Sequence, residues 1–310
     1  MRSRTAVAPA RLVPGRAGGL RDRRVRARPG AARARLVAAG LLGAAAGAVG
    51  YRAAWREPRS LVCPELPLAL PGWPADLDGL RVALVADLHA GAGHMTPARL
   101  SATVDAVLAL GADVHLLLGD YLDASWLGDG RARARDVAGE LARLPDAVAV
   151  LGNHDWRAAG PAMGWALRDA GVRVLENEAV AVRDGLWVAG VACERFRYAD
   201  VGAALRAVPD DAAVLLAVHD PDVFPRVPAR PALTVAGHMH GGQVNVPLLR
   251  RVMLPTRFGE RYLEGHVIER GRHLYVSAGI GTSGLPLRLR RPPEVPVLRL
   301  TAAAPTPPTA

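Results

Sequence analysis

The sequence predicts an α/β domain with parallel pairs of strands between residues 80 and 301. Short apolar runs rich in valine and leucine, bounded by turn residues, recur through this region and are typical of buried strands. Segments with one apolar helical face separate the first three of these runs. Strands that alternate with helices in this way form parallel sheets, because the crossover helices lie on the faces of the sheet.

The first strand is predicted at RVALVADLH, residues 81–89. Pro97 then opens a helix, since proline is well tolerated in the first turn. The apolar face of this helix is formed by Leu100, Val104, Val107 and Leu108. A second buried strand follows at 114–120, and a second helix is expected from about 131 to 144.

The third strand is predicted at AVAVLGNHD, residues 147–155, with a helix near 161–170 after it. The segment 172–192 has the pattern of strands joined as hairpins. The remaining strands are predicted at 213–220, 233–240, 273–280 and 295–300.

The positive charge of the chain lies in its first residues. Residues 1–35 contain eleven arginines and one acidic residue, which accounts for the whole net charge of +10. Residues 51–310 therefore have no net charge. The sequence predicts an Arg-rich cytoplasmic tail and no nucleic-acid partner, because nucleic-acid binding requires a basic face on the folded domain.

An uncharged segment of 16 residues, 36–51, follows the tail. We interpret it as a signal anchor, because arginines that precede an apolar segment stay in the cytoplasm. A cleaved signal peptide and an ordinary alanine-rich helix are the alternatives. The first two interpretations place the folded domain outside the cytoplasm, anchored to the membrane or exported.

Two further segments are predicted to lie outside the folded domain. Residues 52–79 contain repeated prolines and are interpreted as a linker, and residues 302–310 as a disordered tail. In an oxidising compartment Cys63 and Cys193 could form a disulfide, and two unpaired cysteines are the alternative.

Five of the predicted strands end in residues that can bind metal ions. These residues are Asp87 and His89, then Asp120, then Asn153, His154 and Asp155, then His219, and finally His238 and His240. Because ligands collect at the carboxyl ends of strands in α/β sheets, we expect these side chains to lie at one edge.

The residue types indicate a metal centre with nitrogen and oxygen ligands. Carboxylate, imidazole and amide groups suit manganese, iron, zinc or nickel, and the absence of thiolates argues against a structural zinc site. The donors are too many for one ion. Two ions about 3.5–4 Å apart can hold a phosphoryl group for in-line displacement.

The motifs D-x-H, G-D-x-x-D, G-N-H-D, a single histidine and G-H-x-H occur in this order. In this respect residues 78–300 resemble the calcineurin-like metallophosphoesterase superfamily. The GGQ that follows the last motif, and the segment LYVSAGIGTSGLPLRLRRPPE, resemble its YkuE/YaeI-like bacterial branch. The resemblance implies a metallophosphoesterase domain, residues 80–301, folded as a four-layer α/β/β/α sandwich with a dinuclear metal site at the C-terminal ends of the strands.

The resemblance also implies a role for each motif residue. Two divalent ions are implied, of which we favour manganese. The first would be held by Asp87, His89 and His240. The second would be held by Asn153, His219 and His238. Asp120 would bridge the two.

Three more residues receive roles from the same resemblance. His154 would face the phosphate and act on it without binding metal. Asp155 would orient His154, as carboxylates often orient histidines beside metal sites. Asp123 would support the ligands from outside.

The resemblance implies a metal-dependent phosphoric ester hydrolase. Two loops, 246–255 and 285–293, combine apolar residues with arginines, which suits an anionic lipid or a membrane surface, and packing against the sheet edge is the alternative. The resemblance to the bacterial branch implies a cell-envelope or lipid-linked phosphodiester, similar to UDP-diacylglucosamine. The substrate-loop candidates are Trp126, Arg250, Arg251 and Arg288. The alternatives are a cytoplasmic nucleotide or protein phosphatase, and a scaffold of the same fold without activity.

Overall fold

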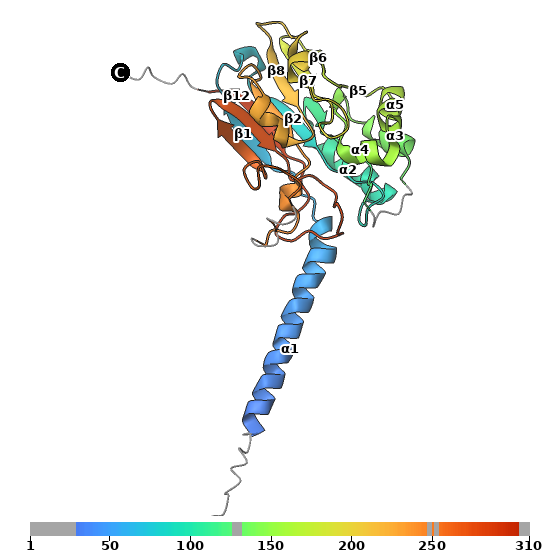
Figure 1. Cartoon of the computed structure of the whole chain (residues 1–310), viewed down its shortest axis with the longest axis vertical. Coiled ribbons are helices and arrows are strands. Elements are labelled where there is room, and N and C mark those ends of the chain that lie inside the picture. The colour runs from blue at the N-terminus through green and yellow to red at the C-terminus, as the bar shows by residue number, and fades with distance from the viewer. Residues whose placement is uncertain (1–28, 126–131, 247–249, 251–253, 304–310) are drawn as a thin grey trace, which may run out of the picture. The chain divides into compact units, whose positions relative to one another are not determined.

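The computed structural model describes residues 29–125, 132–246, 250 and 254–303 (Figure 1). The chain divides into an N-terminal unit, Met1–Gly47, and a larger unit, Ala48–Ala310. Two mixed six-stranded sheets form the framework of the larger unit.

The first sheet has the strand order β1-β12-β2-β3-β4-β5. Strands β2 to β5 pair in parallel, β12 lies antiparallel to β2, and β1 lies parallel to β12 at the edge. The strands are β1 (Glu65–Leu70), β2 (Leu80–Val85), β3 (Val114–Leu117), β4 (Ala147–Ala149), β5 (Arg173–Val174) and β12 (Val297–Ala302).

The second sheet has the strand order β10-β11-β9-β8-β7-β6. Its four central strands run parallel, and a strand at each edge runs antiparallel to its neighbour. The strands are β6 (Glu178–Arg183), β7 (Leu186–Gly190), β8 (Ala213–Ala217), β9 (Leu233–Ala236), β10 (Gly265–Glu269) and β11 (Arg272–Val276).

Helices cover the outer faces of both sheets, and an apolar core fills the space between them. Leu84 and Leu116 of the first sheet pack in one cluster with Leu215 and Val235 of the second. The first sheet is covered by α2 (Pro97–Ala109), α3 (Ala134–Leu141) and α5 (Ala162–Asp169). The second is covered by α6 (Val201–Leu205) and the 3₁₀ helix Pro221–Arg226. The predicted four-layer α/β/β/α sandwich is thus confirmed.

The segment predicted as a linker, 52–79, is part of the folded domain, so this prediction was wrong. β1 lies within it and pairs with β12 over six residues. The side chains of Leu68 and Leu70 point into the core between the sheets. Proline is tolerated because β1 is an edge strand, where a missing backbone N–H leaves no broken ladder. The prolines hid an alternating pattern that is typical of a strand with one buried face.

Two other boundaries differ from the prediction. β4 ends at Ala149, and Asn153–Ala159 form a short helix, α4, instead of the end of the strand. The uncharged segment 36–51 belongs to a longer helix, α1, which spans Pro29–Tyr51. The cysteines Cys63 and Cys193 are both free.

Candidate metal centre

The predicted ligands lie where strands of both sheets end. Asp87 and His89 follow β2, Asp120 follows β3, and Asn153 opens α4 just after β4. His219 follows β8, and His238 and His240 follow β9. All of these side chains are buried. The sequence predicted that these side chains lie at one edge. In the structure, strands of both sheets end at that edge and bring the donors together.

The backbone at this edge is strained. The φ angles of Asp87, His89, Asp120, His238 and His240 lie between 48° and 70°, in the left-handed region that non-glycine residues rarely adopt. Strained residues of this kind persist only where the surrounding structure holds them, and they concentrate at functional sites. The chain therefore turns sharply at donor residues after β2, β3 and β9.

The first group of donors consists of Asp87, His89 and His240, whose ligand atoms lie within 4.8 Å of one another. Nε2 of His89 is 3.0 Å from Nε2 of His240, and that nitrogen is 3.8 Å from Oδ1 of Asp87. Two ring nitrogens this close must share a proton or a cation. The structure thus brings together the three residues predicted to hold the first ion.

The second group consists of Asp120, His219 and His238. Nε2 of His219 is 3.1 Å from Nδ1 of His238 and 3.2 Å from Oδ1 of Asn153. Nδ1 of His219 lies 2.8 Å from the carbonyl oxygen of Leu118 and donates its proton there. The lone pair of Nε2 is therefore free to coordinate a metal. Asn153, His219 and His238 therefore converge as predicted for the second ion.

Asp120 belongs to the second group and also faces the first. Its Oδ2 atom is 3.7 Å from Nε2 of His89 and 3.3 Å from Nε2 of His219. A carboxylate in this position can bridge two ions. Gly152 makes the position available, since a Cβ atom there would collide with the Asp120 carboxylate.

The spacing of the donors fits metal ions. Ligands about 2.1 Å from an ion lie about 3.0 Å apart in octahedral and about 3.4 Å apart in tetrahedral coordination. The donor pairs within the two groups are separated by 3.0 to 3.8 Å. Carboxylate, imidazole and amide donors in this arrangement suit divalent first-row metals. The His/Asp clusters of this fold thus indicate divalent metal ions.

The protonation equilibria of the bare cluster are strongly perturbed. Burial raises the pKa of Asp87 to about 6, although the charge of His219 opposes this shift. Burial and the neighbouring His219 lower the pKa of His238 to about 3. The deprotonated forms of both residues are the ones that bind metal, so a bound cation would stabilise them.

His154 lies beside the donor groups, and its tautomer is fixed by a backbone contact. The amide of Ala124 donates to Nδ1 of His154 over 3.1 Å, so this nitrogen carries no proton. Burial lowers the pKa of His154 to about 4. The ring is therefore neutral near pH 7 and carries its proton on Nε2, which lies 3.4 Å from the hydroxyl of Ser283.

Asp155 does not orient His154, so this prediction was wrong. Its carboxylate accepts hydrogen bonds from the backbone amides of Asp120, Tyr121, Leu122 and Gly152, at 2.8 to 3.0 Å. Asp155 lies in the first turn of α4, and its carboxylate is directed toward these amides instead of toward the His154 ring. It joins the loop after β3 to the loop after β4. Burial, followed by the charge of Asp120, raises its pKa to about 7.

Asp123 lies outside the two groups described above and forms a third with His89 and His154, on the Nδ1 side of both rings. Its Oδ1 is 3.4 Å from Nδ1 of His89 and 3.7 Å from Nδ1 of His154. This carboxylate can hold the proton on Nδ1 of His89, which turns Nε2 toward His240 and Asp120.

A cavity of about 260 Å³ opens over the donors. Its lining includes Asp120, His154 and His238, together with Arg157, Arg195, Gln243 and Ser283, which the sequence analysis missed. Arg157 lies one turn after His154 on α4 and makes no hydrogen bond or ion pair with a described residue. In the sequence, Arg157 could have been identified as a cavity residue because it follows the G-N-H-D motif closely on the same helix. Arg195 lies on the loop after β7, where the sequence carries no comparable signal.

The substrate-loop candidates have different outcomes. Trp126 and Arg251 lie outside the described residues. The guanidinium of Arg250 binds Asn245 and Glu260, so its position is set within its own loop. The prediction for Arg288 was wrong, because its side chain is fully buried and donates to backbone carbonyls.

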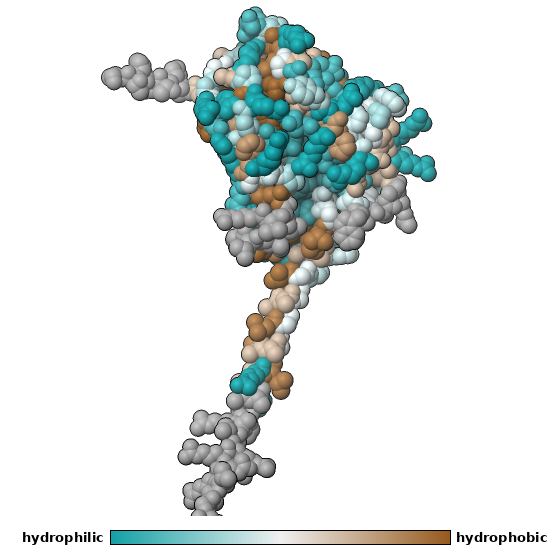
Figure 2. All heavy atoms as spheres, viewed as in Figure 1, coloured by the Kyte–Doolittle hydropathy of each residue, from teal (hydrophilic) through white to brown (hydrophobic). Residues whose placement is uncertain are grey.

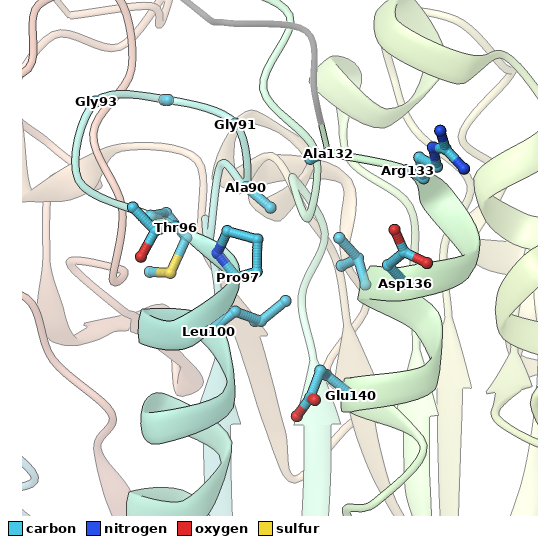
Figure 3. Close-up of a pocket in the computed structure, with 13 residues that line it drawn as sticks. Ala90, Gly91, Gly93, Thr96, Pro97, Leu100, Ala132, Arg133, Asp136 and Glu140 are labelled. Carbon is cyan, nitrogen blue, oxygen red and sulfur yellow. The ribbon is translucent and has the colours of Figure 1, made fainter.

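A larger cavity of about 720 Å³ lies between the N-terminal ends of α2 and α3 (Figure 3). Thr96, Pro97 and Leu100 border it on one side, and Asp136 and Glu140 on the other. It contains none of the donor residues. We therefore place the candidate site at the smaller cavity, where buried donors converge.

Comparisons with known proteins agree with this geometry. Residues 80–242 match the family model described as calcineurin-like phosphoesterase. The chain is 27% identical over 270 residues to the uncharacterized metallophosphoesterase YkuE of Bacillus subtilis, covering 85% of this chain and 93% of that protein. It is 32% identical over 236 residues to the phosphodiesterase YaeI of Escherichia coli, covering 71% of this chain and 82% of that protein.

A third relative is a transmembrane protein with a metallophosphoesterase domain from Danio rerio. It is 28% identical over 261 residues, which are 77% of this chain and 56% of that protein. The match to the family model spans more than half of the chain and includes all the strand ends that deliver donors. The chain belongs to the calcineurin-like phosphoesterase family and is a metal-dependent phosphoric ester hydrolase.

Proposed function

We propose that the chain hydrolyses phosphodiesters of a cell-envelope or lipid-linked substrate, using two divalent metal ions of which manganese is favoured. The position of Asp120 carries the two-ion part of this proposal, because one oxygen of its carboxylate lies near a histidine nitrogen of each donor group, 3.7 Å from His89 and 3.3 Å from His219. Asp87, His89 and His240 would hold one ion. Asn153, His219 and His238 would hold the other.

The bound ions would polarise the phosphoryl oxygens and lower the pKa of an attacking water. His154 supplies a hydrogen-bond donor, which the metal ligands cannot, because their own nitrogen and oxygen atoms would be coordinated. Its Nε2–H is available to donate to a phosphoryl oxygen or to the leaving oxygen. Arg157 and Arg195 line the same cavity and add positive charge for an anionic substrate.

Two observations support a substrate at a membrane. Helix α1 exposes apolar side chains such as Leu36, Leu41 and Leu42, which are 67 to 75% exposed (Figure 2). By length and composition, the apolar part of the helical segment Arg33–Arg59 that precedes Arg52 could cross a membrane. The relative from Danio rerio is named a transmembrane protein with a metallophosphoesterase domain. We therefore propose a membrane anchor, with the catalytic domain outside the cytoplasm.

His154 and His238 should differ in what their removal costs. We expect His154→Ala to keep two ions per chain and to lower kcat by about 10²–10⁴-fold, the range for a positioned proton donor. His238→Ala should lose an ion, because it removes a donor from the second group. Metal content and hydrolysis of bis(4-nitrophenyl) phosphate measure both effects. The exposed His266 offers a matched control, since His266→Gln should change neither quantity. Loss of an ion from His154→Ala but not from His238→Ala would refute the assignment.

The enzyme should prefer substrates that carry acyl chains over the same compounds without them. We expect kcat/KM for a diacylated nucleoside diphosphate sugar in mixed micelles to exceed that for the deacylated compound by at least about tenfold, because apolar burial adds to binding. Initial rates over a panel with phosphomonoesters and phosphoproteins provide the comparison. Faster turnover of soluble nucleotides or phosphoproteins would instead favour the cytoplasmic phosphatase.

The location can be tested without the enzyme's own activity. Residues 1–60 fused to a reporter that is active only outside the cytoplasm should give active, membrane-bound reporter. The same fusion with Leu41 and Leu42 changed to arginine should stay inside, because charges at the centre of a span oppose insertion. A wild-type fusion that remains soluble in the cytoplasm would contradict both the anchor and the export.

A further inference from the structure

The residues directly after α1 form a compact turn that is fixed to the catalytic domain. Arg52–Arg56 make a π-helical turn, and Glu57–Arg59 make a 3₁₀ turn. Glu57 is only 5% exposed although it is a carboxylate. Burial of a charged group is costly unless it is paired or hydrogen-bonded, so the partners of Glu57 indicate what the turn holds.

Glu57 binds the loop 288–291, which lies shortly before β12. Its Oε1 accepts from the backbone amide of Arg291 at 2.5 Å, and its Oε2 accepts from Nε of Arg52 at 2.9 Å. The carbonyl of Ala53 accepts from the backbone amide of Arg288 at 2.9 Å. Two backbone amides of one loop, 288–291, are thus satisfied by the turn after α1.

The side chain of Arg288 continues from this loop to the metal centre. It is fully buried, and its guanidinium donates to the carbonyls of Gly281, Ala278 and Gly279 at 2.8, 2.9 and 3.1 Å. Its Nη2 lies 3.5 Å from Nδ1 of His240. One side chain therefore holds the loop 278–281 and packs behind a predicted metal ligand.

The loop 278–281 encloses Asp87. The amide of Gly281 donates to the carbonyl of Asp87 at 2.6 Å. At Gly279, whose φ is +65°, a Cβ atom would lie 2.7 Å from Oδ2 of Asp87, so the backbone lies directly against the carboxylate. The position of Asp87 thus depends on this loop, and the loop depends on Arg288.

We infer that Glu57 and Arg288 are positioning residues of the first metal site, and that the turn 52–59 forms part of that site's support. The inference rests on the proposed dinuclear function, since it concerns the residues behind Asp87 and His240. The second site is formed by Asn153, His219 and His238, and it meets this network through the backbone amide of His238, which donates to the Asp87 carboxylate at 2.9 and 3.1 Å. The side-chain donors of the second site are held elsewhere, at Leu118 and by one another. Loss of the turn's contacts should therefore weaken binding of the first ion much more than binding of the second.

The test uses the full chain in detergent and measures binding of Mn²⁺ to metal-depleted protein by electron paramagnetic resonance. Two backgrounds isolate the sites: His238→Ala leaves the first donor group complete, and His240→Ala leaves the second. We expect Glu57→Ala to weaken Mn²⁺ binding about 10–100-fold in the His238→Ala background, the usual cost of losing a partner behind a metal ligand. In the His240→Ala background its effect should be less than about twofold.

Matched variants separate this role from general destabilisation. Glu57→Gln keeps an acceptor for the Arg291 amide and should restore most of the affinity. Glu65→Ala removes a carboxylate that pairs with Arg81 at the surface, 3.1 Å away, and should change neither site. If Glu57→Ala fails to fold, Arg288→Lys decides, because the compact ammonium of lysine lacks the planar fork with which the guanidinium bonds the carbonyls through Nε and Nη2. It should give the same selective loss.

Equal Mn²⁺ affinities in the variants and their parents would overturn the inference, and so would an equal loss at both sites. If the unmodified chain binds no Mn²⁺ at all, the proposed dinuclear function fails first. A different result, in which the unmodified chain and Glu57→Ala both bind two ions with equal affinity, would refute the role of Glu57 and leave the dinuclear function intact.

Discussion

The arrangement of the candidate site depends on the close approach of imidazole and carboxylate ligand atoms where strands of the two sheets end. Ring nitrogens lie 3.0 Å apart in one group and 3.1 Å apart in the other, with a single carboxylate between the groups. Buried imidazoles and carboxylates at this spacing repel or share protons, unless a cation lies between them. Divalent metal ions meet this constraint, and they also account for the strained backbone of the donor residues.

The surrounding protein holds that arrangement from three sides. Asp155 joins the loops after β3 and β4 through four backbone amides, and so fixes the backbone of Asp120. Leu118 fixes the tautomer of His219, and Ala124 that of His154. Arg288 and Glu57 fix the loop against Asp87. Each of these contacts involves the backbone, so the geometry of the site is built into the fold.

The sequence predicted the donor residues well, because their positions follow from the strand pattern. Asp87, Asp120, His219 and His238 each come directly after an apolar run, and parallel strands bring such positions to one edge. The helix at Asn153 was not predicted, because three apolar residues of β4 continue without a break into the G-N-H-D motif. β1 was missed because prolines outweighed its alternation of exposed and buried residues. These errors concern local signals that two conformations share.

Residues that act through the backbone were beyond sequence analysis. Nothing near Asp155 indicates that its carboxylate binds amides of a distant loop, and the motif favoured the neighbouring histidine instead. Arg288 resembles its neighbours Arg290 and Arg291 in the sequence, yet Arg290 is exposed and Arg291 half-buried, whereas Arg288 is fully buried. Glu57 reaches Arg291 across 234 positions of the chain, a contact that only the tertiary fold creates.

The central claim is that one carboxylate, Asp120, joins two metal ions. Electron paramagnetic resonance of the Mn²⁺-loaded protein measures this most directly, because two ions about 3.5–4 Å apart and bridged by a carboxylate are magnetically coupled. We predict two Mn²⁺ per chain with a coupled spectrum, and loss of the coupling together with at least one ion in Asp120→Asn. A single ion per chain, or two uncoupled ions that Asp120→Asn leaves unchanged, would contradict the account.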